Sequence, residues 1–198
     1  MIKTEKTRKL TRKDGKSWEQ PMARNFNRPM ATEIETGELL YGLVRAIKPT
    51  NAIETGTFEG FSAVNIAKAL KQNKKGFLYT IDFKDYGSQK MFQDYGIEKW
   101  VQAVIGISPR KLEEITSVIN IDFAFLDGGH TYNIVLSELE VLNRHSRAGI
   151  YITGHDYYRH KGIKRAVDDF TKEYSPIYEK IIISTFTGFF ILKKLTKT

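Results

Sequence analysis

The segment Ala52-Ile-Glu-Thr-Gly-Thr-Phe-Glu-Gly-Phe-Ser62 joins an apolar, strand-like run to a glycine turn that opens a helix. Gly56 and Gly60 permit a tight turn and close approach of the backbone, and the amides at the start of the next helix point toward whatever lies there. Glu54 lies where the strand ends, and a carboxylate there suits a cationic amino group better than a pyrophosphate. The segment therefore predicts a site for a small-molecule cofactor.

An acidic residue ends the next predicted strand. Asp82 follows Gly60 by 22 residues, where a carboxylate can accept hydrogen bonds from both hydroxyls of an adenosine ribose, as in NAD and S-adenosylmethionine sites. Its alternative role is a helix N-cap, which Asp also favours. Phe83 is placed either to lie against adenine or simply to pack.

A second polar segment, Phe125-Leu-Asp-Gly-Gly-His-Thr-Tyr132, follows an apolar run that predicts a strand buried on both faces. Asp127 at its end needs a charged or hydrogen-bonding partner to offset desolvation. His130 follows on the same turn, and an imidazole with a near-neutral pKa suits removal of a proton from a hydroxyl. The alternative for His130 is a helix-capping or core histidine.

The following strand ends in Gly154-His155-Asp156. If this strand lies beside the one that ends at Asp127, then Asp127, His155 and Asp156 meet at one edge of the sheet. Two carboxylates and an imidazole can hold Mg²⁺ or Mn²⁺, with water and substrate oxygens completing the coordination. The alternative is a hydrogen-bonded polar cluster without metal.

Apolar runs alternate with amphipathic stretches along the chain. Thr32 followed by Glu35 predicts a capping box, and Ser108 predicts an N-cap with proline at the first helical position. The predicted helices cover residues 34–47, 60–71, 89–95, 108–118, 132–145 and 163–174. The predicted strands cover residues 51–55, 77–82, 101–105, 121–126, 149–153, 180–183 and 188–192.

This alternation predicts an α/β fold with right-handed crossovers and helices on both faces of a mostly parallel, seven-stranded, Rossmann-like sheet. Only residues 184–187 separate the last two strands, which is too short for a parallel crossover. These strands should therefore form a C-terminal hairpin that makes one strand antiparallel. Six parallel strands would instead have suited a dinucleotide-dependent dehydrogenase.

The composition is that of a globular protein, with 198 residues and 41% hydrophobic side chains. No apolar run approaches the roughly 20 residues of a membrane span, so we expect a cytoplasmic protein. The absence of cysteine excludes a thiol nucleophile and disulfide bonds within the chain.

The net charge of +8 is concentrated at the ends of the chain. Residues 1–28 hold nine Lys or Arg against three acidic residues, whereas residues 29–192 hold 19 positive and 20 negative side chains. We therefore predict a basic, mobile arm over residues 1–28 and a single domain over residues 29–198. An arm that contacts a phosphate-bearing partner is the less favoured alternative.

Together, three motifs resemble methyltransferase domain 24, a small O-methyltransferase-like group of class I S-adenosylmethionine-dependent methyltransferases. They are I-E-T-G-T-F-E-G-F-S, F-L-D-G-G-H-T-Y, and G-H-D-Y followed by G-I-K-R-A-V-D-D-F, and the resemblance covers about residues 32–192. It implies that Glu54, Gly56 and Gly60 hold the methionine end of the cofactor, Asp82 the ribose, and Gly106 to Ser108 the adenine side. We also expect Thr57, Ser62 and Phe83 to bind the cofactor.

The same resemblance assigns Asp127, His155 and Asp156 to a metal site, and it places His130 where relatives often keep a basic catalytic residue. We predict that Asp127 is catalytic together with His130 and that it also contacts the cofactor. This chain departs from the family pattern at two positions. Gly129 stands where relatives frequently carry Asp, and His155 stands where they carry an acid. Each departure removes one negative charge from the proposed site of a hard cation.

The predicted function is methyl transfer from S-adenosylmethionine to an oxygen of a small hydroxylated acceptor, such as a sugar or phenolic metabolite, assisted by a divalent metal. One alternative is a nucleic-acid methyltransferase that uses the basic arm, although D-G-G-H differs from the N-P-P-Y motif of amino-directed base methyltransferases. Others are a cofactor-binding module without catalysis and a nicotinamide-dependent oxidoreductase. The sequence does not indicate an oligomeric state.

Overall fold

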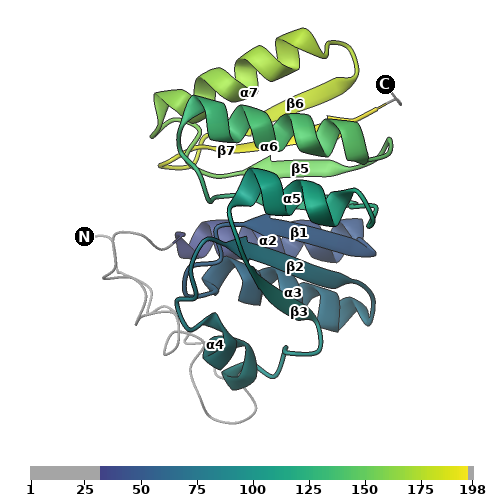
Figure 1. Ribbon diagram of the computed structural model, residues 1–198, viewed down its shortest axis with the longest axis vertical. Helices are drawn as coiled ribbons and strands as arrows, with labels where there is room; N and C mark the ends of the chain where they lie inside the picture. The colour runs from purple at the N-terminus through teal and green to yellow at the C-terminus, as the bar shows by residue number, and fades with distance from the viewer. Residues whose placement is uncertain (1–31, 196–198) are drawn as a thin grey trace, which may run out of the picture.

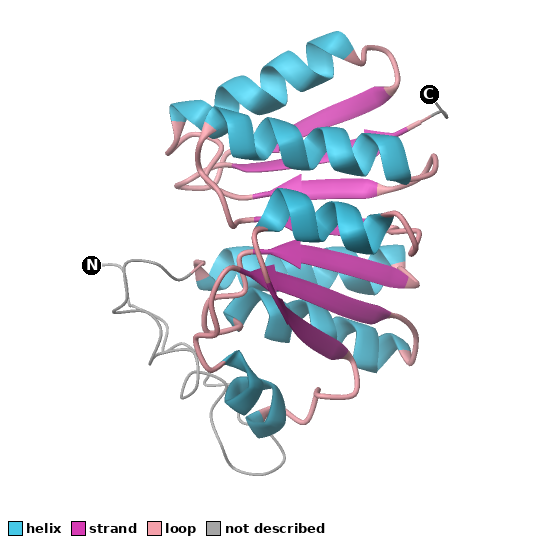
Figure 2. Ribbon diagram, viewed as in Figure 1, coloured by secondary structure: helices cyan, strands magenta, loops and turns pink. Residues whose placement is uncertain are grey.

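A computed structural model describes residues 32–195, so the predicted basic arm over residues 1–28 lies outside the described residues. Within this range one sheet has the strand order β3-β2-β1-β4-β5-β7-β6 (Figures 1 and 2). Its strands are β1 (Asn51–Thr55), β2 (Phe77–Asp82), β3 (Val101–Ile105), β4 (Phe123–Leu126), β5 (Tyr151–Gly154), β6 (Tyr178–Ile183) and β7 (Phe189–Lys194).

Helices cover both faces of the sheet. Figure 1 shows α5, α6 and α7 in front of the strands and α2 and α3 behind them. The helices are α2 (Ile34–Ile47), α3 (Phe61–Asn73), α4 (Ser88–Asp94), α5 (Ser108–Thr116), α6 (Tyr132–His145) and α7 (Lys161–Glu173). Most predicted boundaries agree with these within two residues.

The predicted mixed sheet is confirmed. Strands β3, β2, β1, β4 and β5 pair in parallel, whereas β7 is antiparallel to both β5 and β6. The five residues between β6 and β7 allow only a hairpin, so β7 reverses direction while β6 runs with the other strands. The carboxyl ends of the parallel strands consequently meet at one edge.

Side chains of β4 show why the sheet needs a helical layer on each face. Phe123 and Phe125 pack with the α2 and α3 side, whereas Ala124 and Leu126 pack with the α6 and α7 side. All four are buried. Successive strand residues point to opposite faces, so a continuous apolar run is buried only when both faces are covered.

Both helices begin at the predicted residues, but both predicted N-caps are wrong. Residue Glu33, not Thr32, is the N-cap of α2, without a side-chain capping bond, because Thr32 Oγ1 donates to Asp127 Oδ2 at 2.9 Å. Ile107 is the N-cap of α5, and the Ser108 hydroxyl donates to Glu138 instead. In each case a long-range acceptor binds the hydroxyl that was expected to cap locally.

Candidate functional site

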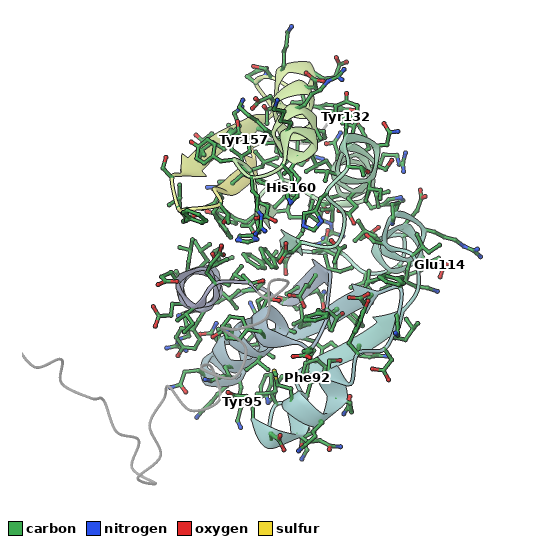
Figure 3. The ribbon with its side chains drawn as sticks, turned by 90° about the vertical axis from the view of Figure 1, so that its left-hand side faces the viewer. Phe92, Tyr95, Glu114, Tyr132, Tyr157 and His160 are labelled. Carbon is green, nitrogen blue, oxygen red and sulfur yellow. The ribbon has the colours of Figure 1, made fainter. Side chains whose placement is uncertain are left out.

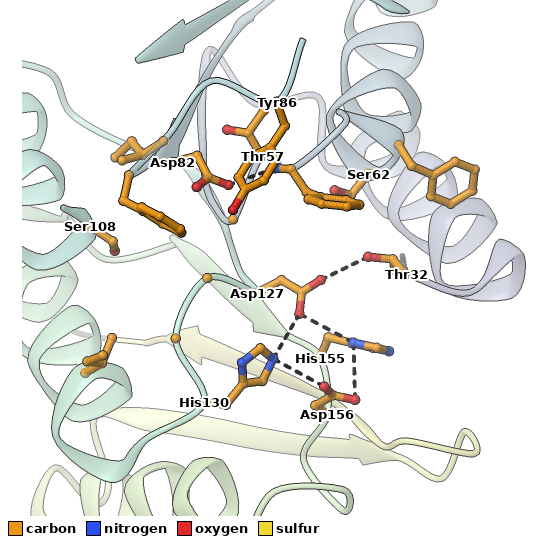
Figure 4. A pocket seen from close by; sticks show the side chains of 18 of the residues that line it. Thr32, Thr57, Ser62, Asp82, Tyr86, Ser108, Asp127, His130, His155 and Asp156 are labelled. Carbon is orange, nitrogen blue, oxygen red and sulfur yellow. Dashed lines mark hydrogen bonds and ion pairs between the residues drawn. The ribbon is translucent and has the colours of Figure 1, made fainter. Parts of the chain in front are cut away.

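A cavity of about 550 Å³ opens where the parallel strands end, on the side of the molecule that faces the viewer in Figure 3. Its volume is typical of small-molecule sites. The close-up in Figure 4 shows Asp82 and Thr57 on one side and His130, His155 and Asp156 on the other, with Asp127 between them. The sequence-predicted residues that line it are Gly56, Thr57, Ser62, Asp82, Phe83, Ser108, Asp127, His130, His155 and Asp156.

The turn after β1 lies directly against the start of the Asp127 segment. Gly56 has φ +91°, and a Cβ atom there would lie 2.5 Å from the carbonyl oxygen of Asp127. The Asp127 amide in turn donates to the Thr55 carbonyl at 2.9 Å. A residue without a side chain is therefore required at position 56, and this close approach joins the cofactor turn to Asp127.

Asp82 is held at the cavity wall by the loop after β1. Its Oδ2 accepts a hydrogen bond from the Phe58 amide at 2.8 Å, and the side chain lines the cavity. It is not a helix N-cap, since Gly87 holds that position in α4. Aromatic rings of Phe58, Phe83 and Tyr86 surround this region, with the Phe58 and Tyr86 ring centroids 4.9 Å apart. Sequence reasoning singled out only Phe83.

Glu54 lies behind the cavity wall, and its side chain is fully buried. Thr80 donates to its Oε2 at 2.5 Å, while Oε1 has no hydrogen-bond partner. Burial raises the pKa of Glu54 to about 8, against hydrogen bonds from Ser62 and Thr80 that lower it. Its link to Ser62, which does line the cavity, makes Glu54 a support for the wall.

Two other predicted cofactor residues also stay off the wall. Gly60 is the N-cap of α3, and the Gly106 amide donates to the Asp82 carbonyl at 2.8 Å, which ties the ends of β2 and β3 together. Beyond Gly106, Ser108 lines the cavity and donates to the buried Glu138 of α6. Burial raises the pKa of Glu138 to about 7. Sequence reasoning missed Glu138. A carboxylate on the apolar face of the helix predicted over residues 132–145 is the signal that could have identified it.

The three predicted metal residues come together. His155 Nδ1 lies 3.5 Å from both Asp127 Oδ1 and Asp156 Oδ1. Their ligand atoms all lie within 4.8 Å of one another. Asp156 is buried, its Oδ1 accepts no hydrogen bond, and its backbone adopts φ +61°, a left-handed conformation that is uncommon for residues other than glycine.

Residues distant in sequence hold His155. Its Nε2 lies 2.5 Å from Glu33 Oε2 and 2.8 Å from Thr187 Oγ1. Burial lowers the pKa of His155, but the hydrogen bond and charge of Asp127, with the charges of Asp156 and Glu33, outweigh it and raise the pKa to about 9. Glu33 thus supplies an acid near the position where His155 replaces the family's acidic residue.

His130 faces the same acids from the other side. Its Nε2 lies 3.3 Å from Asp156 Oδ2 and 4.0 Å from Asp127 Oδ1. The hydrogen bond to Asp156 raises the pKa of His130, despite an opposing effect of burial. Burial raises the pKa of Asp156, but the hydrogen bond from His130 and the charges of the nearby histidines bring it below its usual value. His160, which sequence reasoning missed, completes this group.

Comparisons with known proteins bear on the family and the fold. A family model described as a methyltransferase domain matches residues 53–157, just over half of the chain. No curated protein matches the chain in sequence.

Solved structures share the fold at low sequence identity. An O-methyltransferase from Bacillus cereus in complex with S-adenosylhomocysteine has a TM-score of 0.75 at 19% identity, covering 88% of this chain and 87% of its own. The S-adenosylhomocysteine-bound methyltransferase PaMTH1 of Podospora anserina has a TM-score of 0.73 at 17% identity, with coverages of 89% and 85%. The S-adenosylmethionine-bound O-methyltransferase TomG of Streptomyces achromogenes has a TM-score of 0.70 at 19% identity, covering 87% of this chain and 85% of its own.

In the described part of the chain, no helix combines the length and apolar character needed to cross a membrane. The match to the family model runs from within β1 to beyond β5 and includes most residues that line the cavity, and it agrees with the family that the three sequence motifs resemble. The chain belongs to the methyltransferase domain 24 family of class I S-adenosylmethionine-dependent methyltransferases.

Proposed function

We propose that this protein is an O-methyltransferase that acts on a small hydroxylated acceptor. The observation that carries the proposal is that one cavity has Asp82 on one side and His130 on the other, with Asp127 between them. A donor bound on the first side can present its methyl group to an acceptor on the second, which is the alignment that an in-line displacement requires.

The cofactor supplies the methyl group: the acceptor oxygen forms a bond to the methyl carbon, the carbon–sulfur bond breaks, and S-adenosylhomocysteine leaves with the electron pair. In this proposal Asp82 binds the ribose hydroxyls, while the turn at Gly56 and Thr57, with Ser62, faces the methionine end. Phe83 and Ser108 line the adenine side. Glu54, Gly60 and Gly106 keep these parts of the wall in place.

His130 is the proposed general base, since its Nε2 faces the cavity beside Asp127 and Asp156. It takes the acceptor's hydroxyl proton as the oxygen attacks. The neighbouring carboxylates stabilise the resulting imidazolium, and they already raise the pKa of His130 in the free protein.

Asp127, His155 and Asp156 fit a divalent-metal site, because two carboxylates converge and the buried Asp156 Oδ1 lacks a hydrogen-bond partner. A Mg²⁺ or Mn²⁺ ion held there supplies positive charge that lowers the pKa of an acceptor hydroxyl. His155 must lose its proton to act as a ligand, and its pKa of about 9 makes this a cost of metal binding. The carboxylates of Asp127 and Asp156 are therefore the principal ligands in this proposal.

The acceptor is expected to be a small metabolite, since a cavity of about 550 Å³ that also holds the donor leaves room for a compact molecule. We retain the prediction of a cytoplasmic enzyme. Nucleic acid remains the less favoured acceptor, because the charge argument for it depends on residues 1–28.

Calorimetry and a methyl-transfer assay test this function. We expect S-adenosylhomocysteine to bind and NAD or NADP not to bind. Chelator-treated protein, with labelled S-adenosylmethionine and a panel of sugars and catechols, should transfer methyl groups faster after Mg²⁺ or Mn²⁺ is added. Binding of a nicotinamide cofactor instead would overturn the proposal. Full activity after chelation, unchanged by added metal, would remove the metal from it.

A further inference from the structure

The cavity contains a second group of possible metal ligands. Three of the chain's four histidines line it, and two of them, His130 and His160, have side chains that are 40% and 41% exposed. Their ring centroids lie 4.6 Å apart. Asp156 Oδ2 lies 3.3 Å from His130 Nε2 and 3.5 Å from His160 Nε2.

We propose that His130, Asp156 and His160 form a binding site for a transition-metal ion such as Zn²⁺ or Co²⁺. Ligand atoms about 2.0–2.1 Å from a tetrahedral ion lie about 3.3 Å from one another, which is close to the two measured separations. All three ligand atoms lie within 4.8 Å of one another, so small side-chain rotations can close the set. All three residues line the cavity, from which a fourth ligand can approach.

The backbone builds this group from two segments. The His160 amide donates to the Asp156 carbonyl at 3.1 Å, which folds residue 160 back over residue 156. His160 is the N-cap residue of α7, yet its side chain makes no capping bond. A Cβ atom on Gly162 would lie 2.8 Å from the His130 carbonyl oxygen, so only glycine lets α7 begin against the His130 loop.

The chemistry of the ligands separates this site from the set of Asp127, His155 and Asp156. Imidazole nitrogens favour Zn²⁺, Co²⁺ and Ni²⁺, whereas Mg²⁺ prefers carboxylate and water oxygens. Asp156 belongs to both sets, so the two ions should compete for binding. One consequence rests on the proposed function: a metal on His130 Nε2 occupies the lone pair that the general base needs, so Zn²⁺ should inhibit methyl transfer.

Direct metal binding tests the site without reference to activity. Full-length, chelator-treated protein without a polyhistidine tag is titrated with Co²⁺, and the visible d–d absorption is recorded before and after competition with Zn²⁺. We expect intense bands of the tetrahedral type. His160→Ala should weaken Co²⁺ affinity at least about tenfold. His145→Ala, at the end of α6 outside the cavity, is the matched control and should not weaken it.

Mg²⁺ affinity should be unchanged in His160→Ala. Thermal unfolding of His160→Ala and His160→Gln establishes that each variant is folded, and the Gln variant should also lose the bands. Bands that persist in both variants but disappear in Asp127→Asn would overturn the proposal, as would no bands in the wild type. Calorimetry with S-adenosylhomocysteine reports separately on the proposed function, so loss of cofactor binding with intact Co²⁺ bands would overturn that function and not this site.

Discussion

At the scale of single residues, Asp82 is the sharpest test of the cofactor side, because it faces the cavity while the Phe58 amide fixes its carboxylate. Asp82→Ala removes the acceptor for two ribose hydroxyls, and charged hydrogen bonds of this kind are worth about 1.5 to 3 kcal/mol each. We therefore expect S-adenosylhomocysteine affinity to fall at least about tenfold by calorimetry. Asp94→Ala, an exposed carboxylate on α4, is the control. Equal affinity in the wild type and Asp82→Ala would refute the assignment.

The His130 side allows two behaviours to be separated. His130→Ala should leave cofactor binding intact and lower turnover by about 10²- to 10⁴-fold, the usual contribution of a positioned base. Asp127→Asn should reduce both Mg²⁺ affinity and turnover, since its carboxylate lies beside both His130 and His155. Single-turnover assays at saturating cofactor distinguish the two. If His130→Ala keeps full turnover at every pH, another group removes the proton.

Glu138 makes stability depend on pH. Its folded pKa of about 7 exceeds the ordinary value of 4.5, so the folded protein holds a proton that the unfolded chain releases, and stability falls as pH rises through that window. Glu138→Gln removes this loss. The free energy of unfolding, measured with urea, should fall between pH 5 and pH 8 by on the order of 2 kcal/mol more in the wild type than in the variant. Exposed Glu179→Gln is the control, and an equal gain by both variants would contradict the explanation.

Residues in the backbone motifs were predictable, whereas their distant partners were not. The turn at Gly56 and the segment at Asp127 carry local patterns that follow from strand ends and glycine geometry. Glu33 reaches His155 across 122 positions, and Thr32 reaches Asp127 across 95. No local pattern encodes such contacts. His160 was missed for a related reason. It lies beside His130 only because α7 packs against the loop that carries His130.

At the scale of elements, one carboxylate joins α7 to its surroundings. Asp168 accepts hydrogen bonds from Lys164 at 2.5 Å, Lys180 of β6 at 2.8 Å and Tyr157 at 2.7 Å. Burial raises the pKa of Asp168, but these three hydrogen bonds outweigh it and lower the pKa to about 2. The turn after Asp156 is thereby tied to the helix that follows it.

Because the pKa of Asp168 is lowered, its ionised carboxylate stabilises the fold. This stabilisation is present above about pH 4, the ordinary pKa of an aspartate, and is lost as pH falls toward about 2. Asp168→Asn should therefore reduce the free energy of unfolding at pH 7, with the difference shrinking at pH 3. Asp94→Asn removes a comparable but exposed i,i+4 pair with Lys90 and should cost much less. A difference between wild type and Asp168→Asn that does not change with pH would show that charge is not the cause.

Element types and their order could be predicted because each rests on local periodicity and on loop length. The hairpin of β6 and β7 followed from a short predicted connection, residues 184–187, which spans residues 184–188 in the structure. Helix caps were less predictable than helix bounds, since a Ser or Thr hydroxyl near a helix start can bind any acceptor that the fold brings to it. The hydroxyls of Thr32 and Ser108 both donate to a carboxylate that is distant in sequence.

At the scale of the whole molecule, the charge distribution predicts an arm that is separable from the domain. Removing residues 1–28 deletes a net charge of +6 and leaves the near-neutral remainder intact. We expect this truncation to unfold at the wild-type temperature and to retain cofactor affinity, measured by calorimetry. Removing residues 1–33 should instead disturb the acceptor side, since it also deletes Thr32 and Glu33. Loss of folding in the shorter truncation would show that the arm is structural.

The two sides of the cavity also come from different stretches of the chain. The cofactor side is drawn from residues between Gly56 and Ser108, whereas the other side is drawn from residues after Asp127 together with Thr32 and Glu33. If the proposed function holds, donor recognition and acceptor choice are encoded in separable blocks of sequence, and a chimera that exchanges the second block should change the acceptor without rebuilding the donor site. Substitutions on opposite sides should have additive effects, and Asp127, which touches both, is where double-mutant cycles should find coupling.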